Sequence, residues 1–381
     1  MRGHEALRAA EVTVLDKPMM SRWLAPALAC LAVSVLAGCT SEKGQGAGSS
    51  SAPGRDGTVA LLLKENKTTR WEAFDRPYFT EKWKSLCPGC KLIYSNAEQD
   101  SAKQQAQAEA ALTNGAKVLV ITPVDSEAAV AIVARAKAQK VPVIAYDALI
   151  MNADIDYFVS FQNEKVGELQ GQALLKKLTA DGTADKGKVV WINGSPTDNN
   201  ARQFKKGAHT ALDGKVSVGR EYDTPDWSPD KAQQEMEQAI TALGKDNIVG
   251  VYAANDGTAG GAIAAMKSAG FATLPPVTGQ DAELAAIQRI ISGEQYMTVY
   301  KAIKPEAEAA AELAYALLKG ERPSVPDVVN NGQKDVPARL LTSIAVTRDN
   351  IMDTVVKDGF YKLSDICAAQ YASACAAAHL Q

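Results

Sequence analysis

From residue 58 onward, short runs of apolar, often β-branched residues alternate with longer Ala-rich amphipathic stretches. The apolar runs predict ten strands, at 59–63, 92–95, 118–121, 143–146, 157–161, 189–192, 216–222, 248–252, 276–278 and 297–300. The amphipathic stretches predict helices, among them 71–86, 101–114, 126–139, 166–178, 232–243, 260–269 and 305–318. Continuous apolar strands that alternate with helices are typical of parallel sheets covered on both faces. Ten strands exceed one comfortable sheet, so the pattern predicts an α/β fold with two doubly wound parallel-sheet lobes.

The N-terminal segment follows a different pattern. An apolar stretch at 23–37 is too short to cross a bilayer and is typical of the apolar core of a secretory signal. It ends in LAGC at 36–39, which resembles a bacterial lipobox, where cleavage before Cys39 leaves a thiol that is acylated. A chance cluster of small residues before a plain cleavage site is the alternative.

These observations predict the layout of the N-terminal segment. We expect a lipoprotein signal peptide at 1–38, for which Met19 or Met20 can be the real start. The Ser-, Gly- and Ala-rich segment 39–57 has the composition of a flexible tether. The protein is therefore expected to be exported and lipid-anchored to the outer face of the cytoplasmic membrane.

Composition excludes two other classes of protein. Lys and Arg number 41 against 44 Asp and Glu, a net charge of −3, so there is no basic field to attract a nucleic acid. No apolar run approaches the roughly 20 residues that a transmembrane helix needs, which argues against a polytopic membrane protein.

Four cysteines remain once the signal and the acylated residue are set aside. Cys87, Cys90, Cys367 and Cys375 are an even number in an oxidising compartment, and two local disulfides are the simplest interpretation. The CPGC sequence at 87–90 is also compatible with a redox-active pair. Only three His occur in the chain, so a zinc site is not predicted, nor is any other metal site.

Polar and aromatic residues follow nearly every predicted strand. Open α/β sheets bind ligands beyond the carboxyl ends of their strands, so these residues are candidates for a site between the lobes. They lie in the segments 64–71, 147, 194–200, 226–227, 255–256, 279–281 and 301. Asp, Asn and Lys match sugar hydroxyl groups as acceptors and donors, and indole rings suit the apolar face of a sugar.

A purely structural role is the alternative for each of these residues. Asp or Asn after a strand commonly caps the next helix, and Asn200 and Asp256 are expected to do so. Trp71 and Trp227 suit a lobe core equally well. A secreted enzyme is less compatible, because it needs a nucleophile with a base, a carboxylate pair or a metal, and His209 is a lone histidine in a predicted helix.

Several motifs between about residues 58 and 360 resemble the D-xylose-binding proteins of bacterial ABC importers, within the ribose-binding-like family of periplasmic binding proteins. The motifs are IAYD at 144–147, DIDY at 154–157, NEKVGELQ at 163–170, GSP at 194–196, DNNA at 198–201, ND at 255–256, GQDA at 279–282, MTVYK at 297–301, NNG at 330–332 and DVP at 335–337. The resemblance implies a type I periplasmic binding protein fold and a binding protein for D-xylose, with no catalytic residue and no cofactor.

The resemblance also assigns ligand-binding residues. They are Arg70, Trp71, Asp147, Asp198, Asn199, Asn200, Trp227, Asn255, Asp281 and Lys301. Two positions depart from the family: Ala148 stands where Arg is usual, and Gln162 stands where Asp is usual. A missing Arg removes a donor to the sugar, and Lys64, Lys67 or Arg70 could supply a substitute.

The resemblance implies two lobes joined by a three-strand hinge, with chain crossings near Asn163, Lys301 and Val336. The N-terminal lobe is expected at 58–163 plus 302–336 and the C-terminal lobe at 164–301 plus 337–362, followed by a tail at 363–381. Closure of the lobes on the sugar would present the closed form to a partner.

The implied partners are an ABC permease and its separate ATP-binding subunit, since the chain has no GxxxxGK[ST] phosphate loop. We expect a monomer that binds a monosaccharide, contacts the membrane through its lipid anchor and binds no nucleic acid. A sugar sensor that presents the closed form to a chemoreceptor or a sensor kinase is an alternative, as is a binder of another pentose or a hexose.

Overall fold

The computed structural model describes residues 57–380. The predicted signal peptide, the predicted acylation site at Cys39 and the predicted tether up to residue 56 lie outside the described residues. Within residues 57–380, no helix combines the length and apolar character required to cross a membrane.

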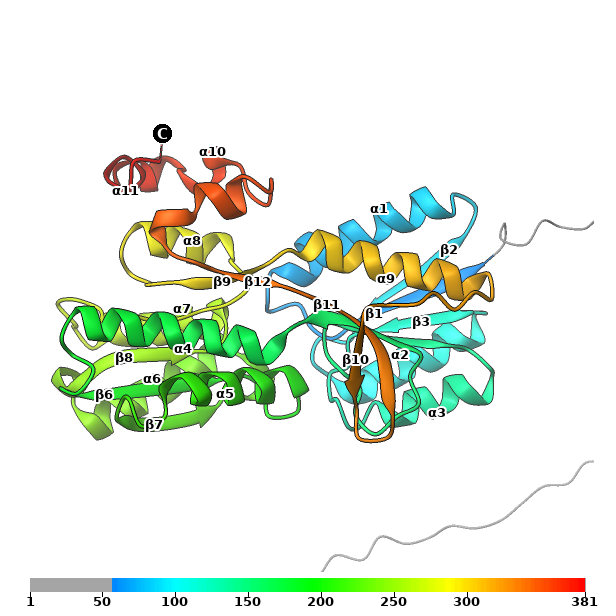
Figure 1. Cartoon of the computed structure of the whole chain (residues 1–381), viewed down its shortest axis with the longest axis horizontal. Helices are drawn as coiled ribbons and strands as arrows, with labels where there is room; N and C mark the ends of the chain where they lie inside the picture. Colours follow the sequence, from blue (N-terminus) through cyan, green and yellow to red (C-terminus); the bar gives the residue numbers. More distant parts are fainter. Residues whose placement is uncertain (1–56, 381) are drawn as a thin grey trace, which may run out of the picture. The chain divides into compact units, whose positions relative to one another are not determined.

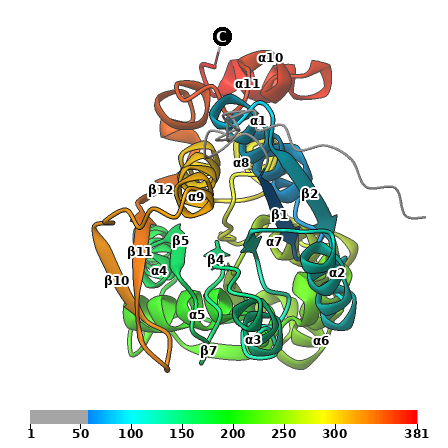
Figure 2. The same ribbon diagram turned by 90° about the vertical axis from the view of Figure 1, so that its right-hand side faces the viewer.

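The first lobe is built on a seven-stranded sheet with the order β10-β11-β5-β4-β3-β1-β2 (Figure 2). All neighbouring strands run parallel, except that β10 is antiparallel to β11. The strands are β1 (Thr58–Leu63), β2 (Lys91–Asn96), β3 (Val118–Ile121), β4 (Val143–Tyr146), β5 (Tyr157–Phe161), β10 (Asp327–Asn330) and β11 (Asp335–Leu341).

Helices cover both faces of this sheet (Figure 1). One face packs against η1 (Trp71–Asp75), α1 (Arg76–Leu86) and α9 (Ile303–Leu318). The other packs against α2 (Ser101–Thr113) and α3 (Val130–Ala138). Because both faces are covered, the central strands β3, β4 and β5 are buried at every position, which explains their unbroken apolar sequences.

The second lobe is built on a smaller parallel sheet with the order β7-β6-β8. Its strands are β6 (Lys188–Asn193), β7 (Val218–Asp223) and β8 (Ile248–Ala253). Helices α4 (Asn163–Ala180) and α5 (Asn199–Leu212) cover one face, and α6 (Pro229–Leu243) and α7 (Asp256–Ser268) cover the other. Short elements complete the lobe: η2 (Pro225–Trp227), η3 (Lys245–Asn247), α8 (Leu284–Ile291), η4 (Arg348–Asn350) and η5 (Met352–Val356).

A bridging segment and the two strands β9 and β12 extend the second lobe beyond β8. The segment around Val277 bridges β8 through Val251, and β9 (Thr298–Lys301) pairs with β12 (Ser343–Val346) in antiparallel fashion. The predicted strand at 276–278 is therefore a single bridge in the described structure, although its backbone still bonds to both neighbouring segments.

Three connections join the lobes. The chain crosses at Gln162, between β5 and α4; at Ala302, between β9 and α9; and at Thr342, between β11 and β12. The third crossing comes later than the expected position near Val336, because β11 stays paired with β5 as far as Leu341. Two doubly wound α/β lobes joined by three strands confirm the predicted fold class.

A compact C-terminal segment packs on the second lobe. It contains α10 (Leu363–Ile366), η6 (Ala369–Tyr371) and α11 (Ala372–Ala377), and a disulfide joins Cys367 to Cys375. Its residues Ile366 and Leu380 share a buried cluster with Ile287 of α8. The structure also joins Cys87 to Cys90, between α1 and β2.

Candidate functional site

A cavity with about 290 Å³ of empty volume lies where the carboxyl ends of the strands of both lobes meet. The residues that line it come from both lobes: Lys64, Glu65, Thr68, Arg70, Trp71, Asp147, Asp198, Asn200, Phe204, Trp227, Asn255, Gln280, Asp281 and Lys301.

Three of the lining residues have left-handed backbone conformations. Asp147 has φ of 59°, Trp227 has φ of 54° and Asp281 has φ of 93°. Asp147 directly follows β4, Trp227 is the last residue of η2, and Asp281 lies between the bridge at Val277 and α8; all three line the cavity. Residues other than glycine adopt this region at a cost and do so preferentially at functional sites, which supports a binding role for this cavity.

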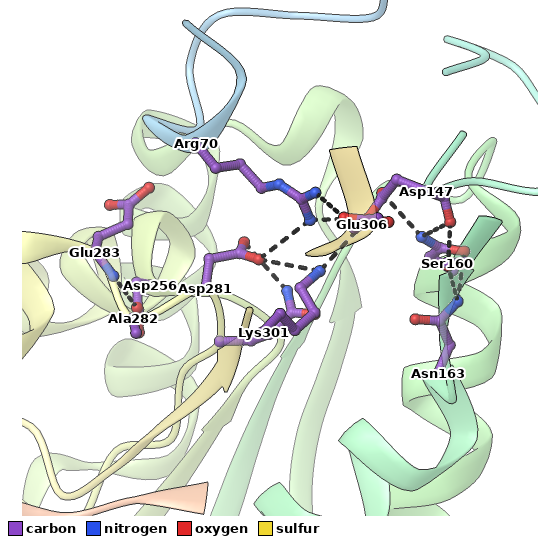
Figure 3. A network of polar contacts seen from close by, with 12 residues as sticks. Arg70, Asp147, Ser160, Asn163, Asp256, Asp281, Ala282, Glu283, Lys301 and Glu306 are labelled. Carbon is purple, nitrogen blue, oxygen red and sulfur yellow. Dashed lines mark hydrogen bonds and ion pairs between the residues drawn. The ribbon is translucent and has the colours of Figure 1, made fainter. Parts of the chain in front are cut away.

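Arg70 organises the first-lobe wall of the cavity (Figure 3). Its side chain is buried, with a relative exposure of 2%. The guanidinium donates to both carboxylate oxygens of Asp75 at 2.9 and 2.7 Å, to Glu306 at 2.7 Å and to Asp147 at 2.8 Å. Four of its five N–H donors are thus committed to carboxylates, and it holds Asp147 in place.

Asp147, Asp281 and Lys301 meet across the lobe boundary (Figure 3). The ammonium of Lys301 lies 3.0 Å from Asp281 Oδ1 and 3.7 Å from Asp147 Oδ1. Burial would raise the pKa of Asp147, but the charges of Arg70, Lys301 and Lys64 outweigh it and lower that pKa to about 2. Asp147 is therefore an anion at neutral pH, and a strong hydrogen-bond acceptor.

Asp198 of the second lobe binds Lys64 of the first lobe and Trp227 of its own lobe. Its Oδ2 accepts from Lys64 Nζ at 2.5 Å and from Trp227 Nε1 at 3.1 Å. Its Oδ1 accepts from Asn200 N at 2.8 Å, which caps α5. Trp227 lies close over Gly194, where a Cβ would overlap the indole ring, so this position requires glycine.

One lining residue carries an unused acceptor. Gln280 has a relative exposure of 2%, and its Nε2 donates to Asp281 Oδ2 at 3.2 Å. Among the described residues, no hydrogen bond reaches its Oε1. Buried polar atoms without a partner are uncommon, so this oxygen is suited to accept from a ligand hydroxyl.

Several hydrogen bonds hold the two lobes together in addition to the ion pairs. Asn200 Nδ2 donates to Asp147 Oδ2 at 3.2 Å, and Asn199 N donates to Ser126 Oγ at 3.0 Å. Thr69 N donates to Glu283 Oε1 at 3.2 Å. The described structure is therefore closed around the cavity.

Two acids beside the cavity have raised pKa values. Burial, with the charge of Glu283, raises the pKa of Asp256 to about 8. Burial, with the charge of Asp281, raises the pKa of Glu283 to about 7. Asp256 accepts from Glu283 N, Thr298 Oγ1 and Gln295 Nε2, so it is a structural group that fixes the start of α7 (Figure 3).

The structure brings together nine of the ten predicted site residues. Arg70, Trp71, Asp147, Asp198, Asn200, Trp227, Asn255, Asp281 and Lys301 all line the cavity. Asn199 does not line it, and its backbone bonds to Ser126 instead. Asn200 and Asp256 were expected to cap helices, but the structure places the caps one or two residues earlier. Asp198 caps α5 and Asn255 caps α7. Asp198 and Asn255 also line the cavity.

Five lining residues are outside the ten predicted site residues: Lys64, Glu65, Thr68, Phe204 and Gln280. Four of them lie in the candidate segments 64–71 and 279–281, and Lys64 was named among the substitute donors. Lys64 and Glu65 directly follow β1, and Gln280 precedes Asp281, so the strand-end signal was present for these three. Phe204 lies within α5, where an apolar residue at helical spacing cannot be told from a core residue. Within residues 57–380, no group of three or more metal-binding side chains is arranged around a metal site.

Comparisons with known proteins agree with this geometry. Residues 59–322 match the family described as periplasmic binding protein domain. The chain is 42% identical over 323 residues to a D-xylose-binding periplasmic protein of Haemophilus influenzae, covering 84% of this chain and 94% of the relative. It is 41% identical over 313 residues to a D-xylose-binding periplasmic protein of Escherichia coli, covering 81% and 92%.

A solved structure shows the same fold. An ABC transporter solute binding protein from Clostridium phytofermentans with bound β-D-glucose is 29% identical and superposes with a TM-score of 0.75, covering 81% of this chain and 99% of that chain. This is a family of binding proteins, which confirms the expectation that the chain is not an enzyme. The chain belongs to the periplasmic binding protein family, with the type I fold.

Proposed function

We propose that the chain captures a neutral monosaccharide, D-xylose foremost, in the cavity between its lobes and delivers it to an ABC permease. The observation that carries the proposal is the composition of the cavity wall. Asp147, Asp198, Asn255 and Asp281 offer acceptors, while two indole rings offer apolar faces for a pyranose ring.

The charge pairing in the cavity favours a neutral ligand. Each cation is already matched by a carboxylate: Lys64 by Asp198, Lys301 by Asp281, and Arg70 by several acids. An acidic sugar would find no unmatched cation and would add a buried negative charge, which is costly. The identities of 42% and 41% to two D-xylose-binding proteins support D-xylose among the neutral sugars.

Calorimetric titration of the mature domain tests the proposal. The panel comprises D-xylose, D-ribose, D-glucose and the acidic sugar D-galacturonate. We expect the neutral pyranoses to bind, with D-xylose the tightest, and D-galacturonate not to bind. Tighter binding of another neutral sugar would refute D-xylose alone, whereas absence of binding by every neutral sugar would refute the function.

Capture involves closure of the lobes about the three connections at Gln162, Ala302 and Thr342. The closed form then presents surfaces of both lobes to the permease, and a separate ATP-binding subunit supplies the energy. The proposal includes a monomer that is held at the outer face of the membrane by a lipid on Cys39. Loss of lipid labelling in Cys39→Ala, with release from the membrane fraction, is the expected result, and unchanged labelling would refute the anchor.

A further inference from the structure

Lys64 is a buried cation that joins the two lobes. It directly follows β1 in the first lobe and has a relative exposure of 4%. Its Nζ lies 2.5 Å from Oδ2 of Asp198, which caps α5 in the second lobe. A buried ammonium loses its hydration, so it persists only where charged or polar partners replace the water.

Two indole rings flank this ammonium. Nζ of Lys64 lies 5.2 Å from the ring centroid of Trp71 in the first lobe and 5.7 Å from that of Trp227 in the second. Both distances are within the range of cation–π attraction, about 6 Å. Burial lowers the pKa of Lys64, but the charges of Asp198 and Asp147 outweigh it and raise that pKa above its ordinary value. The ammonium is therefore charged at neutral pH.

The ammonium also has donors to spare at the cavity wall. Of its three N–H groups, one donates to Asp198, and within residues 57–380 this is the one hydrogen bond that Lys64 Nζ makes. The other two cations of the same loop differ from it. Arg70 has four N–H groups committed to carboxylates, and the side chain of Lys67 is exposed and does not line the cavity.

We propose that Lys64 is a specificity-determining residue that donates a charge-assisted hydrogen bond to one hydroxyl oxygen of the bound sugar. The proposal rests on the proposed sugar-binding function and deepens it. Asp198 and the two indoles fix the position of the ammonium, so its remaining N–H groups point to one region of the ligand. A sugar hydroxyl accepts from the ammonium and in turn donates to a carboxylate such as Asp147. A sugar that lacks this hydroxyl leaves the ammonium without its acceptor.

A series of monodeoxy-D-xyloses tests the proposal by calorimetric titration against the parent and Lys64→Met. Methionine keeps an unbranched side chain that is one heavy atom shorter, and it removes the charge. In the parent, removal of one particular hydroxyl should lower the affinity about 10- to 100-fold. In Lys64→Met that difference should disappear, while the losses for the other deoxy sugars stay as in the parent.

Two further variants separate specificity from folding and from closure. Lys64→Arg keeps the charge and the donors and should retain the deoxy preference. Ser126→Ala removes the oxygen that accepts from Asn199 N across the lobes, outside the cavity. It should weaken closure and so lower the affinity for every sugar of the series by the same factor.

The results distinguish the two proposals. If Lys64→Met lowers the affinity for all analogues by one common factor, as Ser126→Ala does, then Lys64 acts only through closure and the specificity role is refuted. The same conclusion holds if Lys64→Met keeps the full deoxy preference of the parent. If the parent binds no neutral sugar at all, the proposed function itself falls, and the role of Lys64 falls with it.

Discussion

Gly194→Ala is the smallest substitution that should displace an aromatic ring from the cavity. Gly194 follows β6 directly, and an ideal Cβ at this position would overlap the six-membered ring of the Trp227 indole. Carbon atoms in contact stay about 3.5 to 4.0 Å apart, so the ring has to move by more than about 1 Å. Such a movement breaks the hydrogen bond from Trp227 Nε1 to Asp198 Oδ2, now 3.1 Å long.

The magnitude follows from the two interactions that are lost. A hydrogen bond to a charged group contributes about 1.5 to 3 kcal/mol. Stacking of a ring on the indole contributes about 0.5 to 1.5 kcal/mol beyond its buried area. Together they amount to about 2 to 4.5 kcal/mol, so the affinity for D-xylose should fall about 30- to 2,000-fold.

Calorimetric titration of four variants provides the assay. Gly194→Ala and Trp227→Ala should each weaken D-xylose binding, and the double variant should bind like Trp227→Ala alone, because no ring is then left to overlap the added methyl group. Gly257→Ala is the matched control. Its Cβ would lie 3.5 Å from the nearest atom, Pro229 Cγ, an ordinary contact, so it should bind like the parent. Additive losses in the double variant would refute the reasoning.

Four further predictions concern other parts of the chain. Asp281→Ala removes a buried acceptor that also pairs with Lys301, so the binding free energy of D-xylose should weaken by about 1 to 3 kcal/mol. An unchanged affinity in calorimetric titration would show that the cavity is not the binding site. Ala148→Arg should weaken binding, because Ala148 is fully buried and a guanidinium overpacks its surroundings; tighter binding would contradict this. The pKa of Glu283, raised from 4.5 to about 7, adds stability that is fully present below about pH 4.5 and is lost as the pH rises through 7. Urea unfolding should therefore show a loss of about 1 to 3 kcal/mol between pH 5 and 8 that is smaller in Glu283→Gln, and identical pH profiles would count against it. Serine at both Cys367 and Cys375 opens a short loop, so the free energy of unfolding should fall by about 3 kcal/mol at most, and a larger loss would contradict a merely local role.

The regular core of the fold was predictable because it depends on local patterns. Strands 118–121, 143–146 and 157–161 have the predicted limits, and each is buried along its whole length. Their unbroken apolar sequences follow directly from helices that cover both faces of the sheet. The positions of β10, β11 and β12 were not predicted.

Those three strands lack the same signal for a physical reason. β10 alternates between half-buried and exposed residues at the edge of its sheet, and β12 does so for three of its four residues. β11 and β12 depend on partners far away in sequence, β5 and β9, and β10 in turn pairs with β11, so the residues of these strands resemble a loop. The third crossing lies at Thr342 rather than near Val336 because of the same pairing between β11 and β5.

The site was predictable where a functional residue directly follows a strand. Asp147 lies in such a position, directly after β4, and Asp281 was found because it comes three residues after the predicted strand at 276–278. Both have a left-handed backbone, which Asp adopts more readily than most residues but which the sequence alone does not reveal. Lys64 has the strand-end signal as well, yet its importance depends on Asp198 and Trp227 of the other lobe. Only the fold brings these three together.

The discontinuous first sheet has a consequence for the order in which the protein folds. β5 pairs with β11, and Phe158 is aligned with Ala338, so nearly the whole second lobe lies between the two partners in sequence. Closing such a long loop is slow, and the pairing must wait until the end of the chain has been synthesised. Any fragment that ends before Asp335 leaves β5 as an open edge able to pair with other chains. Premature termination shortly before Asp335 therefore endangers the lobe that is synthesised first, because β5 then lacks its partner.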